Sequence, residues 1–200
     1  MAPCWNLALT WHYANVGMSH AHDDIDRFVA QRDGWSGSRA GVPTLPPTER
    51  RREHMLLTAS LTTGVARVTS GMLESTKLVD EILRSDHVDW ETTLIVGDSE
   101  FHRSKDGPYP DHQLRISVRP SVGFAALNYM DNNDPVMPIA NSFNPKRPLP
   151  EVSLIFNGTT GAIFPRTAAI SIEDARAALI EWLGTRKRPT CIEWRPYDSY

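Results

Sequence analysis

The sequence predicts an α+β fold, in which a mainly antiparallel sheet packs with about three helices in a single domain over residues 1–200. Three observations predict it. Segments in which apolar side chains alternate with period 2 outnumber segments with helical spacing. A hairpin signal stands in the C-terminal third. The chain has no internal repeat or linker, and its 200 residues, 40% of them hydrophobic, suffice for one buried core.

The first 50 residues predict a strand, a helix and a loop. Apolar and polar side chains alternate over residues 5–13, which is typical of a half-buried strand. A short helix is expected around residues 25–29, because Asp23 and the acids that follow it suit the positive end of a helix dipole. Residues 33–50 contain three Gly and three Pro and predict a long surface loop.

The middle of the chain predicts four strands and one helix. The strands are expected at residues 54–62, 92–97, 114–119 and 122–130, and the helix at residues 73–84. In the third of these strands apolar residues alternate with Arg115, Ser117 and Arg119. This strand is therefore expected to have one face in water.

An irregular stretch and a hairpin follow. Residues 131–150 are rich in Asn and Pro and predict irregular structure. Residues 152–164 predict a hairpin that turns at Asn157-Gly158, because this pair tolerates the positive φ of a tight turn.

The last helix has the clearest signals. Ser171 is the expected N-cap, with Asp174 three residues later, and Gly184 is the expected stop. Leu179 and Trp182 share one face and are expected to be buried against the sheet. A strand over residues 190–195 closes the chain.

Composition excludes several classes of function. The net charge of −3 and a pI near 6.2 argue against a nucleic-acid binder, which needs a surplus of Lys and Arg. Only Cys4 and Cys191 are present, so a disulfide framework is excluded and a reducing compartment is expected. The N-terminus does not resemble a signal peptide, and no run approaches the roughly 20 apolar residues of a membrane span. We therefore expect a cytoplasmic protein that contacts no membrane.

One cluster has the residue types of a metal site. His20, His22 and Asp23 could supply two imidazoles and one carboxylate to a hydrolytic metal. The segment also lies at an expected helix entrance, where Asp23 is explained as a cap. The other histidines stand singly, no nucleophile elbow or phosphate-binding glycine loop is present, and Cys191 is expected to be a buried structural thiol. We therefore expect no cofactor, no metal and no enzymatic activity.

The most unusual charge feature is an acidic run. Between Asp86 and Asp111 there are seven acids, and only Arg103 and Lys105 oppose them, so the local charge is −5. Such a run is either a solvated face or a surface complementary to a basic partner. The second interpretation places an interface in the loops of residues 98–134, with Tyr109 as the aromatic anchor. Trp35, on its own loop, is the second candidate for an aromatic anchor. The candidate partner-binding residues are Asp98, Glu100, Asp106, Tyr109, Asp131, Asp134 and Trp35.

The C-terminal third resembles a known family. The segments in question are Gly161-Ala-Ile-Phe-Pro165, the helix Ser171-Ile-Glu-Asp-Ala-Arg-Ala-Ala-Leu-Ile-Glu-Trp-Leu183, and Arg188-Pro-Thr-Cys-Ile-Glu-Trp194. Together they resemble the deaminase-immunity family of bacterial polymorphic toxin systems, the first of the numbered Imm families. The chain departs from the family at the turn, where Gly184-Thr185 stands in place of the usual Thr-Gly order.

The resemblance implies an immunity protein. Such a protein would bind a cognate toxin domain, commonly a nucleic-acid cytidine deaminase, and would neutralise it stoichiometrically at or near its active site. Two alternatives remain: an immunity protein against a nuclease toxin, and a metal-dependent hydrolase that uses His20, His22 and Asp23.

Overall fold

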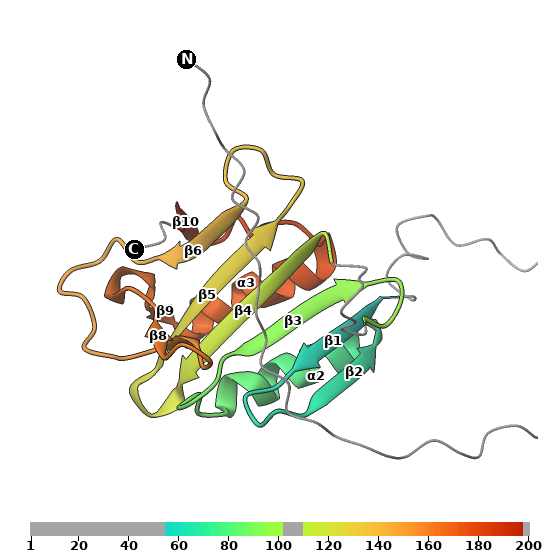
Figure 1. The fold of residues 1–200 in the computed structure, drawn as a ribbon, viewed down its shortest axis with the longest axis horizontal. Helices are drawn as coiled ribbons and strands as arrows, with labels where there is room; N and C mark the ends of the chain where they lie inside the picture. The colour runs from blue at the N-terminus through green and yellow to red at the C-terminus, as the bar shows by residue number, and fades with distance from the viewer. Residues whose placement is uncertain (1–54, 102–109, 198–200) are drawn as a thin grey trace, which may run out of the picture. The chain divides into compact units, whose positions relative to one another are not determined.

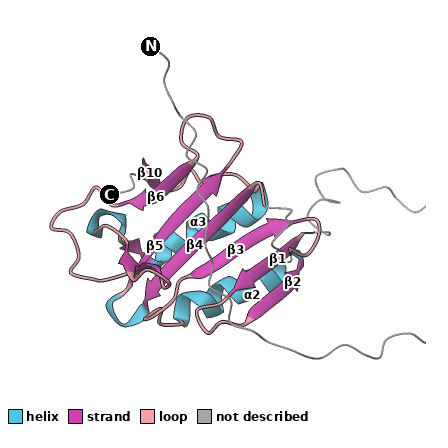
Figure 2. Cartoon of the chain, viewed as in Figure 1, coloured by secondary structure: helices cyan, strands magenta, loops and turns pink. Residues whose placement is uncertain are grey.

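The computed structural model of the chain describes residues 55–101 and 110–197. In these residues eight strands form one antiparallel sheet, and both α-helices lie on the same face of it (Figure 1). The strand order is β10-β6-β5-β4-β3-β1-β2, and the short β9 pairs with the start of β5. Figure 2 shows the same elements coloured by type. The sheet strands are β1 (Leu56–Ser60), β2 (Ala66–Ser70), β3 (Thr92–Gly97), β4 (His112–Arg119), β5 (Phe124–Asp131), β6 (Ile139–Phe143), β9 (Ile170–Ser171) and β10 (Glu193–Pro196).

The remaining elements are two α-helices, a hairpin and two short 3₁₀ helices, Pro120–Val122 and Arg166–Ala168. The helices are α2 (Gly71–Arg84) and α3 (Ile172–Thr185), and the hairpin consists of β7 (Ile155–Asn157) and β8 (Ala162–Ile163). The predicted class, α+β with a mainly antiparallel sheet, is confirmed. The strand expected at residues 5–13 and the helix expected at 25–29 lie outside the described residues. The single domain over residues 1–200 therefore stays a prediction.

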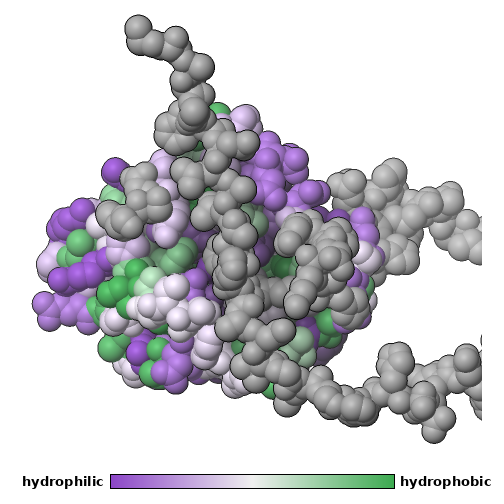
Figure 3. Space-filling model, viewed as in Figure 1, coloured by the Kyte–Doolittle hydropathy of each residue, from purple (hydrophilic) through white to green (hydrophobic). Residues whose placement is uncertain are grey.

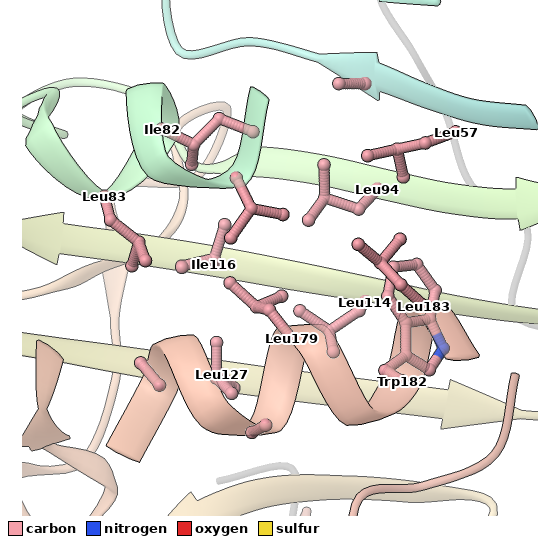
Figure 4. Close-up of a cluster of buried hydrophobic side chains, with 14 of the residues drawn as sticks. Leu57, Ile82, Leu83, Leu94, Leu114, Ile116, Leu127, Leu179, Trp182 and Leu183 are labelled. Carbon is pink, nitrogen blue, oxygen red and sulfur yellow. The ribbon is translucent and has the colours of Figure 1, made fainter. Parts of the chain in front are cut away.

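The main core lies between the helices and the sheet. Leu114, Ile116 and Val118 point toward the helices from β4, with the alternation that the sequence predicts. On α3, Leu179 and Trp182 are fully buried, as expected (Figure 4). The expected cap is also confirmed, because the Ser171 hydroxyl accepts a hydrogen bond from the backbone N–H of Asp174 at 3.0 Å.

The second face of the sheet is partly covered as well, which corrects one expectation. Arg115 and Ser117 were expected in water, yet they are 5% and 0% exposed. The reason is the β7–β8 hairpin and its flanking segments, which pack a small apolar cluster around Phe164 over this face. Apolar side chains gather at the lower left of Figure 3, near β8. The Arg115 guanidinium lies over the Phe156 ring, 5.5 Å from its centroid.

The expected irregular structure at residues 131–150 is wrong in part, because β6 lies within it. This strand lacks a clear apolar alternation because it contains buried polar residues, and these residues form hydrogen bonds with their neighbours. The Asn128 amide donates to Asn141 Oδ1 at 2.9 Å. The Ser142 hydroxyl accepts from the Leu127 N–H at 3.0 Å and donates to the Ala168 carbonyl at 2.6 Å. A buried polar strand is stable when each group has such a partner.

Two glycine expectations are also corrected. The hairpin residue with positive φ is Gly161, and not Gly158. Gly158 instead approaches the neighbouring loop so closely that a Cβ atom there would lie 2.4 Å from the Asp89 carbonyl oxygen. Helix α3 continues past Gly184 to Thr185, and Arg186 is the left-handed residue that ends it, with φ of 57°. Neither helix of the described residues is long and apolar enough to cross a membrane.

Candidate functional site

Loops meet at one end of the sheet, where β3 and β5 finish, β4 and β6 begin, and α3 ends (Figure 1). We call residues 98–101, 131–138 and 186–192 the loop end. Four of the predicted partner-binding residues lie there: Asp98, Glu100, Asp131 and Asp134. Asp106, Tyr109 and Trp35 lie outside the described residues.

The basic residues after α3 pair with acids of the loop end. Arg186 is the left-handed residue that ends α3, and its guanidinium Nη2 lies 2.6 Å from Asp98 Oδ1, just after β3. Two residues later, Arg188 Nη2 lies 3.0 Å from Asp134 Oδ2. The other Arg188 terminal nitrogen donates to the Met137 carbonyl at 2.9 Å. Counting charges along the chain therefore overestimates the negative charge of this surface, because two arginines from distant parts of the chain, one of them 88 residues from its partner, lie against it.

Asp131 and Asp134 hold their own loop in place. Asp131 accepts from the Asn133 N–H at 2.9 Å and from the Tyr129 hydroxyl at 3.2 Å. Asp134 Oδ1 accepts from two backbone N–H groups, those of residues 136 and 137, at 2.9 and 3.0 Å. These N–H groups, with Arg188, hold the pKa of Asp134 below its usual value. Both carboxylates are thus engaged in local structure.

Asp98 and Glu100 are presented differently. Both residues are exposed, and the Asp98 side chain keeps 67% of its surface in water while it pairs with Arg186. The segment is tied to the sheet because the Phe101 N–H donates to the Thr58 hydroxyl at 3.2 Å. These two carboxylates are therefore held on an anchored segment and face solvent. Of the described candidates, they are the best placed to meet a basic partner.

A family model described as Immunity protein Imm1 matches residues 67–196, from β2 to β10. The chain belongs to the Imm1 family of immunity proteins. It is therefore an immunity protein that acts against a toxin. The resemblance noted in the C-terminal third is confirmed at the level of the Imm1 family, and the match extends it from within β2 to β10, with both described helices included. No curated protein matches the sequence.

Beneath the loop end, the half-buried His112 packs against the fully buried Trp182. His112 meets the edge of Trp182 with ring centroids 6.0 Å apart and an interplanar angle of 83°. Burial lowers the pKa of His112, although the nearby Asp131 opposes this effect. Burial therefore favours the neutral form of His112, which lies at the base of the loop end.

The segment after α3 is fixed by Glu181. Its carboxylate accepts from the N–H and hydroxyl of Thr190, both at 2.8 Å, and from the Cys191 N–H at 3.1 Å. These bonds lower the pKa of Glu181 to about 2. Cys191 is exposed and precedes β10, so the expectation of a buried thiol within a strand is wrong. Partial burial and Glu181 raise the pKa of the thiol to about 11, so it is a weak nucleophile.

The metal hypothesis receives no support from the described part of the chain. Within it, no group of three or more His, Cys, Asp or Glu side chains is placed to hold a metal ion. His20, His22 and Asp23 lie outside that part. The residues that sequence reasoning missed are Arg186 and Arg188, because their ion pairs with Asp98 and Asp134 join segments far apart in the chain.

Proposed function

We propose that this immunity protein neutralises a nucleic-acid cytidine deaminase toxin by binding one toxin domain at or near its active site. It acts as a stoichiometric inhibitor and catalyses no reaction of its own. Because such a toxin damages nucleic acid inside the cell, the protective complex forms in the cytoplasm. The proposal rests on the family membership together with one feature of the loop end, the exposed carboxylates of Asp98 and Glu100.

The physical argument is electrostatic. A toxin that binds nucleic acid needs positively charged side chains around its active site to neutralise the phosphates. Carboxylates on an anchored loop attract such a surface, raise the association rate and set the orientation of docking. Because the Asp98 side chain already contacts Arg186 but remains 67% exposed, it can add a partner cation without losing its internal one. Asp106, Tyr109 and Trp35 belong to the proposed interface as predictions from sequence.

A nuclease toxin would present similar cations, so the reaction itself must be assayed. A candidate cognate toxin domain is purified and given single-stranded DNA, duplex DNA and RNA, with uracil formation and strand cleavage measured separately. We expect uracil formation that falls linearly as immunity protein is added and ends at one equivalent. Cleavage without deamination would replace the deaminase with a nuclease. Inhibition that requires only catalytic amounts of immunity protein would refute the stoichiometric mechanism.

The loop end is tested by binding kinetics. In the triple variant Asp98→Asn, Glu100→Gln, Asp106→Asn we expect slower association and a weaker dependence of the association rate on salt. Asp131 and Asp134 are left intact because their carboxylates hold the loop. The matched control is Glu151→Gln, whose side chain is 92% exposed and lies outside the loop end. If the triple variant and the control associate at the same rate, the acidic run is only a solvated face.

A further inference from the structure

A hollow of about 330 Å³ opens between β6, β10 and the segments beside them. Asn141 pairs with Asn128 on one side and with Arg195 on the other. Paired residues share a face of the sheet, and for these three residues it is the face opposite the helices, where the hollow lies. It is lined by Asn141, Ser142, Phe143, Arg147, Pro165, Thr167, Arg195 and Pro196. Among the described residues that line the hollow none is acidic, and none belongs to the loop end.

Two guanidinium groups line the hollow, and each is fixed by contacts other than ion pairs. Arg195 stacks over the Phe143 ring, 4.1 Å from its centroid. The Arg147 guanidinium donates to the carbonyls of Asn144 and Lys146 at 3.2 and 2.9 Å. Within the described residues neither guanidinium has a carboxylate at ion-pair distance. Glu193 lies on the same face of β10, two residues before Arg195, and still forms no ion pair with it.

A third donor is buried in the wall. Asn141 is only 6% exposed, and its Oδ1 is occupied because it accepts from the Asn128 amide at 2.9 Å. This bond fixes the orientation of the Asn141 amide and leaves its NH₂ group as a donor. The neighbouring Ser142 hydroxyl is already committed to two backbone groups. The hollow therefore combines two oriented guanidinium groups with a buried amide donor.

We infer that this hollow binds a small organic oxyanion. A phosphate or carboxylate group is held by Arg147, Arg195 and the Asn141 amide, since planar guanidinium forks match the geometry of both groups. A compact carbon skeleton rests against Pro165 and Pro196. A volume near 330 Å³ is at the lower end of the range for small-molecule sites. The inference does not depend on the identity of the toxin.

The test uses the full chain and follows the arginine Nε–H signals by NMR during titration. The probes are phenyl phosphate, inorganic phosphate and benzoate, each compared with sodium chloride at equal ionic strength. We expect saturable shifts confined to Arg147 and Arg195. Phenyl phosphate should bind about threefold or more tightly than inorganic phosphate, because only its ring can contact the prolines. Saturation by benzoate as well would identify carboxylates as ligands; saturation by the phosphates alone would restrict the site to phosphate esters.

Two variants test the assigned contacts. Arg195→Gln removes one guanidinium, and Asn141→Asp keeps the oxygen that Asn128 needs while it replaces the donor with a charge. Both should reduce phenyl phosphate affinity tenfold or more, about the value of one charge-assisted hydrogen bond. Lys187→Gln, which changes an exposed charge outside the hollow, should leave the affinity unchanged. Equal shifts in sodium chloride, or unchanged affinity in Asn141→Asp protein with a native melting temperature, would overturn the inference.

Discussion

Replacing Trp182 with Ala should destabilise the immunity protein by about 3–5 kcal/mol. The side chain is fully buried between α3 and β4, among residues labelled in Figure 4. An aromatic side chain of this kind removes about 150–250 Å² from water, worth about 25 cal/mol per Å², which gives about 4–6 kcal/mol. The true loss is somewhat smaller, because alanine retains part of this burial and the indole N–H has no partner among the described residues.

The assay is urea unfolding followed by circular dichroism, with thermal melting as a second measurement. For a chain of this length the expected loss lowers the melting temperature by about 6–20 °C. Trp182→Phe, which keeps most of the volume and removes the N–H, should lose less than half as much stability. Toxin binding should fail only at temperatures where the alanine variant is unfolded. A Trp182→Ala protein that melts like the parent but does not bind would refute this reasoning and make Trp182 an interface anchor.

Three further predictions concern pH and packing. Burial lowers the pKa of His87 to about 4. The neutral form of His87 therefore contributes about 3 kcal/mol to the free energy of unfolding, which is present above pH 6.5 and lost as the pH falls toward 4. The urea midpoint of a His87→Gln variant should change less across this pH window than that of the parent. The pKa of Glu181 is lowered to about 2, chiefly by the Thr190 N–H, so its contribution is present above pH 4.5 and lost below it, and Glu181→Gln should flatten the stability profile between pH 4.5 and 2. Gly158→Ala should lower the free energy of unfolding by about 1–3 kcal/mol, because the new Cβ would collide with the Asp89 carbonyl and the Trp90 ring. Thr159→Ala, at the adjacent exposed position, should leave it unchanged in the same unfolding assay.

Much of the fold was predictable from local patterns. The apolar positions of β4 and of α3 repeat at the periods of a strand and a helix, so the buried residues Leu114 and Trp182 follow from spacing alone. The Ser171 cap is also a local signal, because the hydroxyl and the N–H that it accepts from lie three residues apart. The family resemblance rests on these same structural segments.

The candidate site was predictable only in part, because its electrostatics depend on distant residues. The sequence identifies an acidic run that includes Asp98, and it identifies the basic residues after α3. It does not indicate that Arg186 would reach Asp98 across 88 positions, which reduces the net charge of the loop end. Nor does it distinguish carboxylates that brace a loop, such as Asp134, from those that face solvent, such as Glu100.

What the sequence by itself determined is most of the described strands and both described helices, without β2 and β6, together with the apolar side of each and the family to which the chain belongs. Only the tertiary structure decided where polar side chains find partners. Ser117 is buried because a hairpin 40 residues later covers it, and Asn141 belongs to a strand because Asn128 is across from it. The physical reason is one of range. Periodicity and capping act over three or four residues, whereas the satisfaction of a buried polar group or charge depends on whichever segment folding brings beside it.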